Sequence, residues 1–177
     1  MPGNRYGGQQ RGAPPRGGQG PGREQPQERT LDQIWPDYLR QGYFEDAEKK
    51  TLRKDLVSRA RVQPLVEEMA VRARPNLKNN QLRRFFQHCR AIEAKIRGGT
   101  ATWGDVRAEF LKLDSAAADA YRGGKGDSKI PQIFHDFIKR NVEAVRDENE
   151  FLGGFLPHFE ALVGFAAQFV KDQTERS

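Results

Sequence analysis

The chain has 177 residues, enough for one domain with a sizeable core. Its formal charge is +6, from 30 Lys and Arg against 24 Asp and Glu, which suits a polyanionic partner without requiring one. The single cysteine, Cys89, excludes an intrachain disulfide and a thiolate-rich zinc site, and no apolar stretch approaches the roughly 18 residues of a membrane span. We therefore expect a soluble, cytoplasmic protein with no membrane contact.

The first 29 residues differ in composition from the rest of the chain. They hold eight Gly, five Pro and five Arg but one aromatic residue, Tyr6, so they cannot bury enough apolar surface to offset the cost of ordering. We expect a disordered tail over residues 1–29 and one domain over residues 30–177. The element Arg16-Gly17-Gly18 is typical of segments that hold nucleic acid without sequence preference. The alternative is a linker or a solubilising tail.

Beyond the tail, the spacing of apolar residues is helical almost throughout. Thr30 and Asp32 begin a short predicted helix that Gly42 ends. The segment over residues 51–72 follows, and we expect Pro64 to divide it. An interior proline costs about 3 kcal/mol and more often marks a kink or the first turn of a helix.

The next helix is predicted over residues 80–97. Asn79 or Asn80 is expected to cap it, because either side chain can accept hydrogen bonds from the unpaired backbone N–H groups of the first turn. Thr102 and Asp105 resemble a capping box and begin another helix, which stops at the glycines after Tyr121.

Two further helices complete the predicted body. One follows Pro131, and the other is a C-terminal helix over residues 151–169, in which apolar residues repeat at every third or fourth position. We expect a bend in the latter between Gly153 and Pro157. The pattern as a whole predicts an all-α fold, a compact bundle of five to seven helices.

The helix over residues 80–97 carries an unusual distribution of charge. Its apolar side chains fall within about one third of the helical circumference. They are Leu82, Phe85, Phe86, Cys89, Ile92 and Ile96. Arg83, Arg90 and Arg97 line an adjacent sector about 10 Å apart, which we call the arginine edge. Such an edge can follow a phosphate backbone, since arginine makes bidentate phosphate contacts. The alternative is a solvated face whose charges pair weakly with neighbours such as Glu93.

No pattern of residues points to catalysis. The histidines occur neither at metal-binding spacing nor beside a recognisable nucleophile, and Cys89 lies on the apolar side of its helix. The acidic residues between 147 and 150 are explained more simply by a solvated helix junction than by a metal. The glycine-rich loop over residues 123–129 lacks the order of a phosphate-binding loop. We expect no enzymatic activity and no cofactor.

The order of several motifs resembles the small subunit of the type III-A CRISPR effector, the Csm complex, over roughly residues 36–170. The motifs are Tyr38-Leu39-Arg40-Gln41-Gly42-Tyr43-Phe44, Leu52 to Val57, Leu77-Lys78-Asn79-Asn80-Gln81-Leu82-Arg83-Arg84-Phe85-Phe86 and Phe159-Glu160-Ala161-Leu162-Val163. The most specific part is Gln81-Leu82-Arg83 at the start of a helix.

The resemblance implies a helical subunit without an active site of its own, stacked in several copies along a ribonucleoprotein used in antiviral defence. Its implied partners are the guide RNA, the target RNA, the large subunit, the backbone subunit and further copies of itself. The implied RNA contacts are Arg83, Arg90 and Arg97, followed by Lys78, Arg53, Lys54 and Arg140. The alternative is a helical architectural protein that binds other proteins without direct RNA contact.

Overall fold

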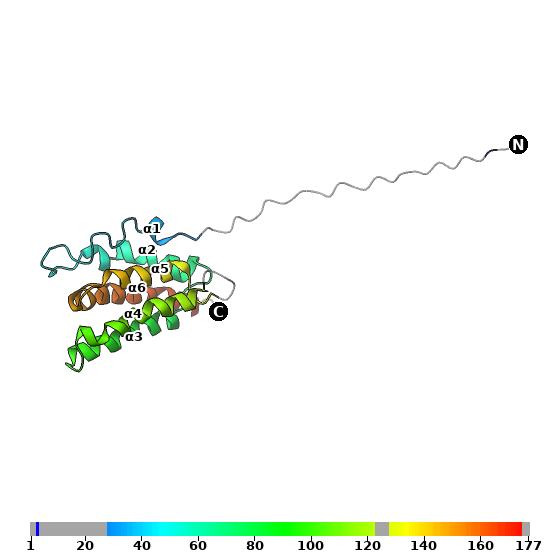
Figure 1. Ribbon diagram of the computed structural model, residues 1–177. Helices are drawn as coiled ribbons and strands as arrows, with labels where there is room; N and C mark the ends of the chain where they lie inside the picture. The colour runs from blue at the N-terminus through cyan, green and yellow to red at the C-terminus, as the bar shows by residue number, and fades with distance from the viewer. Residues whose placement is uncertain (1–2, 4–27, 123–127, 175–177) are drawn as a thin grey trace.

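The computed structural model describes Gly3, residues 28–122 and residues 128–174, with side chains in the last helix up to residue 169. In chain order its helices are α1 (Leu31–Ile34), η1 (Lys54–Val57), α2 (Arg59–Glu67), η2 (Glu68–Arg72), α3 (Asn79–Arg97), α4 (Trp103–Tyr121), α5 (Gln132–Ala144), η4 (Glu150–Phe155) and α6 (Leu156–Thr174). The described residues contain one isolated bridge, Phe44 to Leu52, and no strand. The all-α prediction is confirmed, and Figure 1 shows the helices gathered into one bundle.

The first helix is shorter than expected. α1 ends before Trp35 rather than near Gly42, because Trp35 precedes Pro36 and a residue before proline is pushed out of the helical region. Thr30 begins α1 as expected: its N–H donates to Gln33 Oε1 over 2.8 Å, and the Gln33 N–H donates to Thr30 Oγ1 over 3.3 Å.

The segment over residues 51–72 is divided at Ser58, so the prediction of a boundary at Pro64 is wrong. Ser58 has an extended backbone, with φ −79° and ψ 142°, and separates η1 from α2. Pro64 lies inside α2. Its neighbours Leu65 and Val66 are buried where α2 packs on α6, and this burial offsets the helical cost of the proline.

The start of α3 also corrects a prediction. Lys78 is the cap residue, and its N–H donates to Gln81 Oε1 over 2.9 Å. Neither Asn79 nor Asn80 caps the helix. The helix begins one residue earlier than predicted, because the Gln81 side chain accepts a hydrogen bond from the backbone N–H of Lys78. Asn79 instead lies in the first turn, where its Oδ1 atom is buried without a hydrogen-bond partner.

Most of the remaining predicted helix ends are confirmed, although α6 continues to Thr174, beyond the predicted end at residue 169. Gly98 ends α3, and Thr102 begins α4 with its N–H donating to Asp105 Oδ2 over 2.8 Å. Pro131 precedes α5. Where we expect a bend between Gly153 and Pro157, the structure has the π-helical turn η4, which leads directly into α6.

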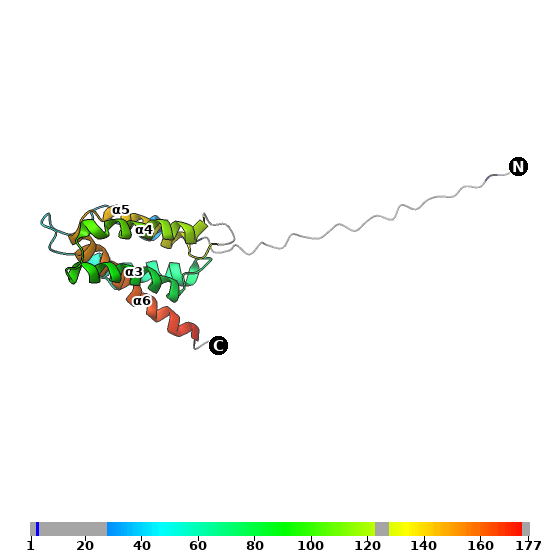
Figure 2. The same cartoon turned by 60° about the horizontal axis from the view of Figure 1, so that its bottom comes forward.

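One hydrophobic core holds the helices together. Its largest fully buried side chains are phenylalanines from α4, α5, η4 and α6. They are Phe110, Phe134, Phe137, Phe151, Phe155 and Phe159. Burying each contributes roughly 1.5–3 kcal/mol, and edge-to-face pairs such as Phe110 with Phe151, 5.3 Å between ring centroids, fix how the helices meet. Figure 2 shows α4 and α5 in one layer, with α3 beside them and the end of α6 extending away.

A chain of buried hydrogen bonds crosses this core. The Tyr43 hydroxyl donates to Asn141 Oδ1 over 2.9 Å, and Asn141 Nδ2 donates to the Tyr38 hydroxyl oxygen over 2.7 Å. His158 Nδ1 bonds to the Leu56 carbonyl oxygen, which can only accept, so Nδ1 carries the proton. Nε2 must then accept from the Tyr38 hydroxyl, over 2.7 Å. This network ties the segment before α2 to α5 and α6.

The N-terminal tail lies largely outside the described residues, as does most of the glycine-rich loop over residues 123–129. At the end of the tail, Arg29 already belongs to the folded body. Its backbone N–H and its Nε each donate to a carboxylate oxygen of Glu68, both over 3.0 Å, and Glu68 is 1 % exposed. Across the described ranges, no helix has the length and apolarity of a membrane span.

Candidate nucleic-acid interface

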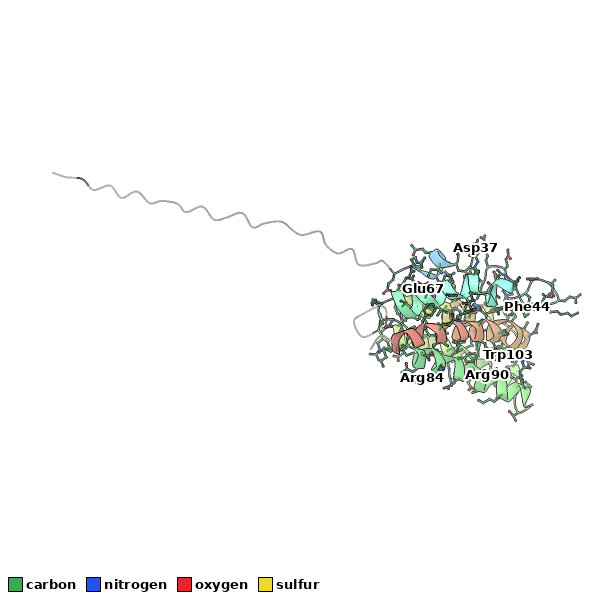
Figure 3. All side chains as sticks on the ribbon, turned by 180° about the vertical axis from the view of Figure 1, so that it is seen from behind. Asp37, Phe44, Glu67, Arg84, Arg90 and Trp103 are labelled. Carbon is green, nitrogen blue, oxygen red and sulfur yellow. The ribbon has the colours of Figure 1, made fainter. Side chains whose placement is uncertain are left out.

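The structure places the arginine edge on the side of α3 that faces α6. At 100° per residue, Arg83, Arg90 and Arg97 lie within about 40° of one another, and all three are exposed. Phe86 projects next to them and packs against Phe159 of α6, with 5.4 Å between ring centroids. Figure 3 shows Arg90 on this helix. The arginine edge is therefore accessible to solvent, while the neighbouring Phe86 anchors α3 to the core.

Glu93 organises two of the three arginines. Its Oε2 atom lies 2.5 Å from Arg90 Nη1, and its Oε1 atom lies 2.7 Å from Arg97 Nε. Glu93 is only 7 % exposed, whereas the side chains of Arg90 and Arg97 are 51 % and 61 % exposed, so each pair joins a nearly buried carboxylate to a guanidinium group that water still reaches. Glu93, Arg90 and Arg97 together carry one positive charge, and each of the two guanidinium groups keeps N–H groups for a further acceptor. Within the described residues, Arg83 makes no ion pair.

This arrangement predicts a compensating effect on stability. Replacing Arg90 and Arg97 together by Gln is expected to lower the free energy of unfolding by about 1–3 kcal/mol, because the nearly buried Glu93 loses both counter-charges. Adding Glu93→Gln should restore much of that loss, since an amide needs no counter-ion. Chemical denaturation of the three proteins measures the effect. An equal loss with and without Glu93→Gln would show that the arginines stabilise α3 by packing alone.

The other predicted RNA contacts do not gather at the arginine edge. Arg140 on α5 binds Asp32 of α1 through Nη1 to Oδ1, 2.7 Å, and Nη2 to Oδ2, 2.5 Å. This hydrogen bonding lowers the pKa of the Asp32 carboxyl. Arg53 is largely buried, and it donates to the Gly42 carbonyl over 3.0 Å and to Asp55 over 2.6 Å. Both arginines therefore hold the N-terminal segment against the bundle.

The two predicted lysines are placed differently from these arginines. Lys54 is exposed at the start of η1, beside Phe44. Figure 3 shows Phe44 well separated from Arg84 and Arg90. Lys78 is exposed at the start of α3, so it lies on the same helix as the arginine edge. Of the four further candidates, only Lys78 is close along the chain to the three arginines.

The opposite edge of α3 borders a groove that we did not predict from the sequence. This α3–α4 groove has a volume of about 450 Å³. It is lined by Gln81, Arg84, Phe85, His88, Lys112, Leu113, Ala116, Asp119, Ala120, Lys129 and Ile130. The cations come from three separate parts of the chain. Helical spacing reveals the pairs within each helix, Gln81 with Phe85 and Lys112 with Ala116, but not that the two helices face each other.

Two other groups with chemical potential have structural roles. Cys89 is fully buried, burial raises the pKa of its thiol to about 12, and its Sγ–H donates to the Phe85 carbonyl over 3.4 Å. This confirms the expected core position. In the acidic segment, Lys49 Nζ lies 2.8 Å from both Asp147 Oδ2 and Glu150 Oε1. Among the described residues, no group of three or more His, Cys, Asp or Glu is placed to hold a metal ion.

Comparison with known proteins identifies the family of this chain. A family model described as Csm2 Type III-A matches residues 53–171, which is more than half of the chain. The matched range contains α2 to α5, nearly all of α6, the arginine edge and the α3–α4 groove. No curated protein and no solved structure gives a significant match. The chain belongs to the Csm2 type III-A family, the small subunits of the type III-A Csm effector complex.

Proposed function

We propose that the chain is a non-catalytic RNA-binding subunit that stacks in several copies along the type III-A effector and holds the guide and target RNAs during antiviral defence. Membership of the Csm2 family supports association with the other Csm subunits. Within that assembly, the proposed partners are the large subunit, the backbone subunit, both RNA strands and further copies of this chain. The subunit's proposed role is to position the RNA strands. This role needs cationic side chains held in place rather than catalytic groups.

The arginine edge is the observation that carries this proposal. Arg83 is exposed without an ion pair in the described part of the chain, and Glu93 holds Arg90 and Arg97 in defined positions. Side chains that are already ordered lose less conformational entropy when they bind a partner. Guanidinium groups can bind phosphate oxygens in pairs, and contacts to phosphate are independent of RNA sequence because the phosphates are the same at every position.

The remaining candidates take unequal parts in the proposal. Lys78, the exposed cap residue of α3, provides a separate RNA contact at the start of that helix. Lys54 is exposed and provides a separate RNA contact on η1. Arg53 and Arg140 act mainly by holding the N-terminal segment, since their guanidinium groups are already bound to Asp55 and Asp32. Their contribution to RNA affinity is expected to be smaller.

Removal of the arginine edge is expected to weaken RNA binding without preference for sequence. The test variant combines Arg83→Ala, Arg90→Gln and Arg97→Gln with Glu93→Gln, which avoids leaving a buried carboxylate unpaired. In the assembled complex, affinity for unrelated target RNAs should fall by about tenfold or more to a similar extent. The slope of log K against log salt should fall by about 2. Binding is measured over a series of salt concentrations.

A matched control separates the arginine edge from net charge. The test variant lowers the charge of the chain by two, and so does the combination of Arg107→Gln and Lys139→Gln, both exposed residues outside α3. The control should reduce the affinity by less than the test variant. Equal affinity and equal salt slope in the test variant and the unaltered complex would overturn the proposal. That result, with assembly intact, would favour an architectural subunit without RNA contact.

A further inference from the structure

The α3–α4 groove is separate from the arginine edge. Arg84 lies about 100° around α3 from Arg83, on the side that faces α4. A volume of about 450 Å³ falls within the usual range for small-molecule sites. A double helix is far too large for such a space, whereas one nucleotide is of the right order. The backbone contacts proposed for the arginine edge leave this groove without a role.

The inner part of the groove is apolar. Leu113 and Ile130 are 2 % and 1 % exposed, so they form a wall that does not shift easily. Phe85 is half-buried beside them, and its ring packs edge-to-face on Phe134 with 5.2 Å between centroids. A ring held in this way offers a fixed surface to a flat, weakly polar group. Aromatic contacts of this kind are the common means of holding an unpaired base.

The rim of the groove is positively charged. Arg84, Lys112 and Lys129 are exposed, and none has a carboxylate partner among the described residues. Asp119 is the one carboxylate in the lining, and its Oδ1 atom is 3.8 Å from Arg122 outside the groove. The lining therefore carries a net charge of +2, from three cations and one carboxylate. This charge is complementary to a phosphate group.

Two neutral side chains complete the polar part. Gln81, in the first turn of α3, is fixed by a hydrogen bond across the groove: its Nε2 donates to the Lys129 carbonyl over 2.7 Å. His88 Nε2 lies 3.1 Å from the Glu109 carbonyl, an acceptor, so Nε2 donates and the neutral ring keeps Nδ1 as an acceptor. The groove thus combines cations for a phosphate with an acceptor suited to the N–H groups of a base.

We propose that the α3–α4 groove binds one unpaired nucleotide of an RNA strand. The base lies against Phe85 and Leu113, and the phosphate lies among Arg84, Lys112 and Lys129. An unpaired base is required because stacking and pairing hide the base faces inside a duplex. The choice of RNA rests on the proposed function, whereas the nucleotide chemistry rests on the groove itself. A free nucleotide has the same chemistry, so the experiment must distinguish the two sources.

Photo-crosslinking locates the nucleotide directly. The assembled complex is bound to target RNA that carries 4-thiouridine at successive positions, irradiated and analysed by mass spectrometry. We expect crosslinks to Phe85 or His88 from a subset of positions. Crosslinks only to the opposite side of α3, near Arg83 or Gln87, would overturn the groove but leave RNA binding by the subunit intact. Absence of any crosslink to this chain would count against both proposals.

Charge variants of the groove provide a second test. The pair Lys112→Gln and Lys129→Gln should weaken binding of a single-stranded oligouridylate to the full chain by about five- to tenfold. Asp119→Asn should strengthen this binding by roughly two- to threefold, because it removes a negative charge that repels the phosphate. The Arg107→Gln and Lys139→Gln control removes equal charge elsewhere and should change it less. Equal effects of the groove pair and this control would overturn the proposal.

A titration with AMP tests the free-nucleotide source. Methyl NMR signals of Leu113 and Ile130 report on occupancy of the groove. We expect only weak shifts with AMP and larger shifts with the oligouridylate at the same concentration, because the strand adds contacts outside the groove. Tight AMP binding without an oligouridylate effect would overturn the assignment to an RNA strand.

Discussion

The folded domain is expected to lose about 3 kcal/mol of stability on acidification because of His158 alone. Burial is the main cause of a pKa lowered to about 4 in the folded state, against an ordinary value near 6.5 in the unfolded chain. Between these values the unfolded chain binds one proton that the folded domain does not. The contribution is therefore fully present above pH 6.5 or so and is lost as the pH falls toward 4.

The hydrogen-bond network explains why His158 resists protonation. A charged ring would need an acceptor at Nε2, where the Tyr38 hydroxyl already donates. The Tyr38 oxygen could accept from a protonated Nε2 only if the hydroxyl hydrogen turned away from the ring. That oxygen already accepts a hydrogen bond from Asn141. A buried imidazolium would also lose its hydration. Protonation of the ring would thus leave the Tyr38 O–H without its acceptor inside the core.

NMR titration of the His158 ring and urea denaturation between about pH 7 and pH 4.5 check this prediction. The ring should stay mostly a neutral Nδ1–H tautomer down to about pH 5, and the free energy of unfolding should fall by about 2 kcal/mol over the whole window. His158→Phe should flatten the part of the pH dependence between about pH 6.5 and pH 5, while lowering stability at every pH. A ring that titrates near its ordinary value would contradict the assignment.

Gly154→Ala is expected to destabilise the domain by about 3 kcal/mol, comparable to severe overpacking. A Cβ at this position would lie 2.6 Å from Tyr43 Cγ and 2.7 Å from Tyr43 Cβ, closer than carbon atoms can approach. Tyr43 is 2 % exposed, and its hydroxyl is bonded to Asn141, so the ring cannot move without breaking the network. Either η4 or the tyrosine must shift.

Gly164→Ala is the matched control for this substitution. Gly164 lies in α6 with no atom within 4 Å of an added Cβ. Alanine there should raise stability by up to about 1 kcal/mol, because it favours the helix. Urea midpoints of the two variants should therefore move in opposite directions from the unaltered protein. A free energy of unfolding for Gly154→Ala within about 0.5 kcal/mol of the unaltered protein would show that the close approach to Tyr43 is not needed.

The two proposed RNA contacts divide the work of α3 between its edges. The arginine edge faces α6 and offers guanidinium groups held by Glu93. The α3–α4 groove lies on the other edge and offers an apolar wall with a cationic rim. A backbone contact and a nucleotide contact on one rigid helix would fix both the path and the register of a strand. The variants of each edge are independent, so the two contacts can be measured separately.

Much of the fold could be predicted because it depends on local periodicity. The positions of α3 to α6 follow from apolar residues at every third or fourth position and from end signals such as Gly98 and Thr102. The arginine edge is also local, since residues seven apart share one side of a helix. At Pro64 and Asn79, distant packing or a neighbouring side chain outweighed the local preference, and the early end of α1 follows from Pro36, a local signal that the prediction did not use.

The sequence by itself determined the helical fold, most helix ends and the alignment of Arg83, Arg90 and Arg97. Only the tertiary structure decided which charges act together. It paired Arg140 with Asp32, 108 positions away, and brought Lys112 and Lys129 beside Arg84. It also linked Tyr38 to His158 across 120 positions. The physical reason is that periodicity assigns each side chain to a face of its own helix, whereas the packing of the shared aromatic core determines which faces meet.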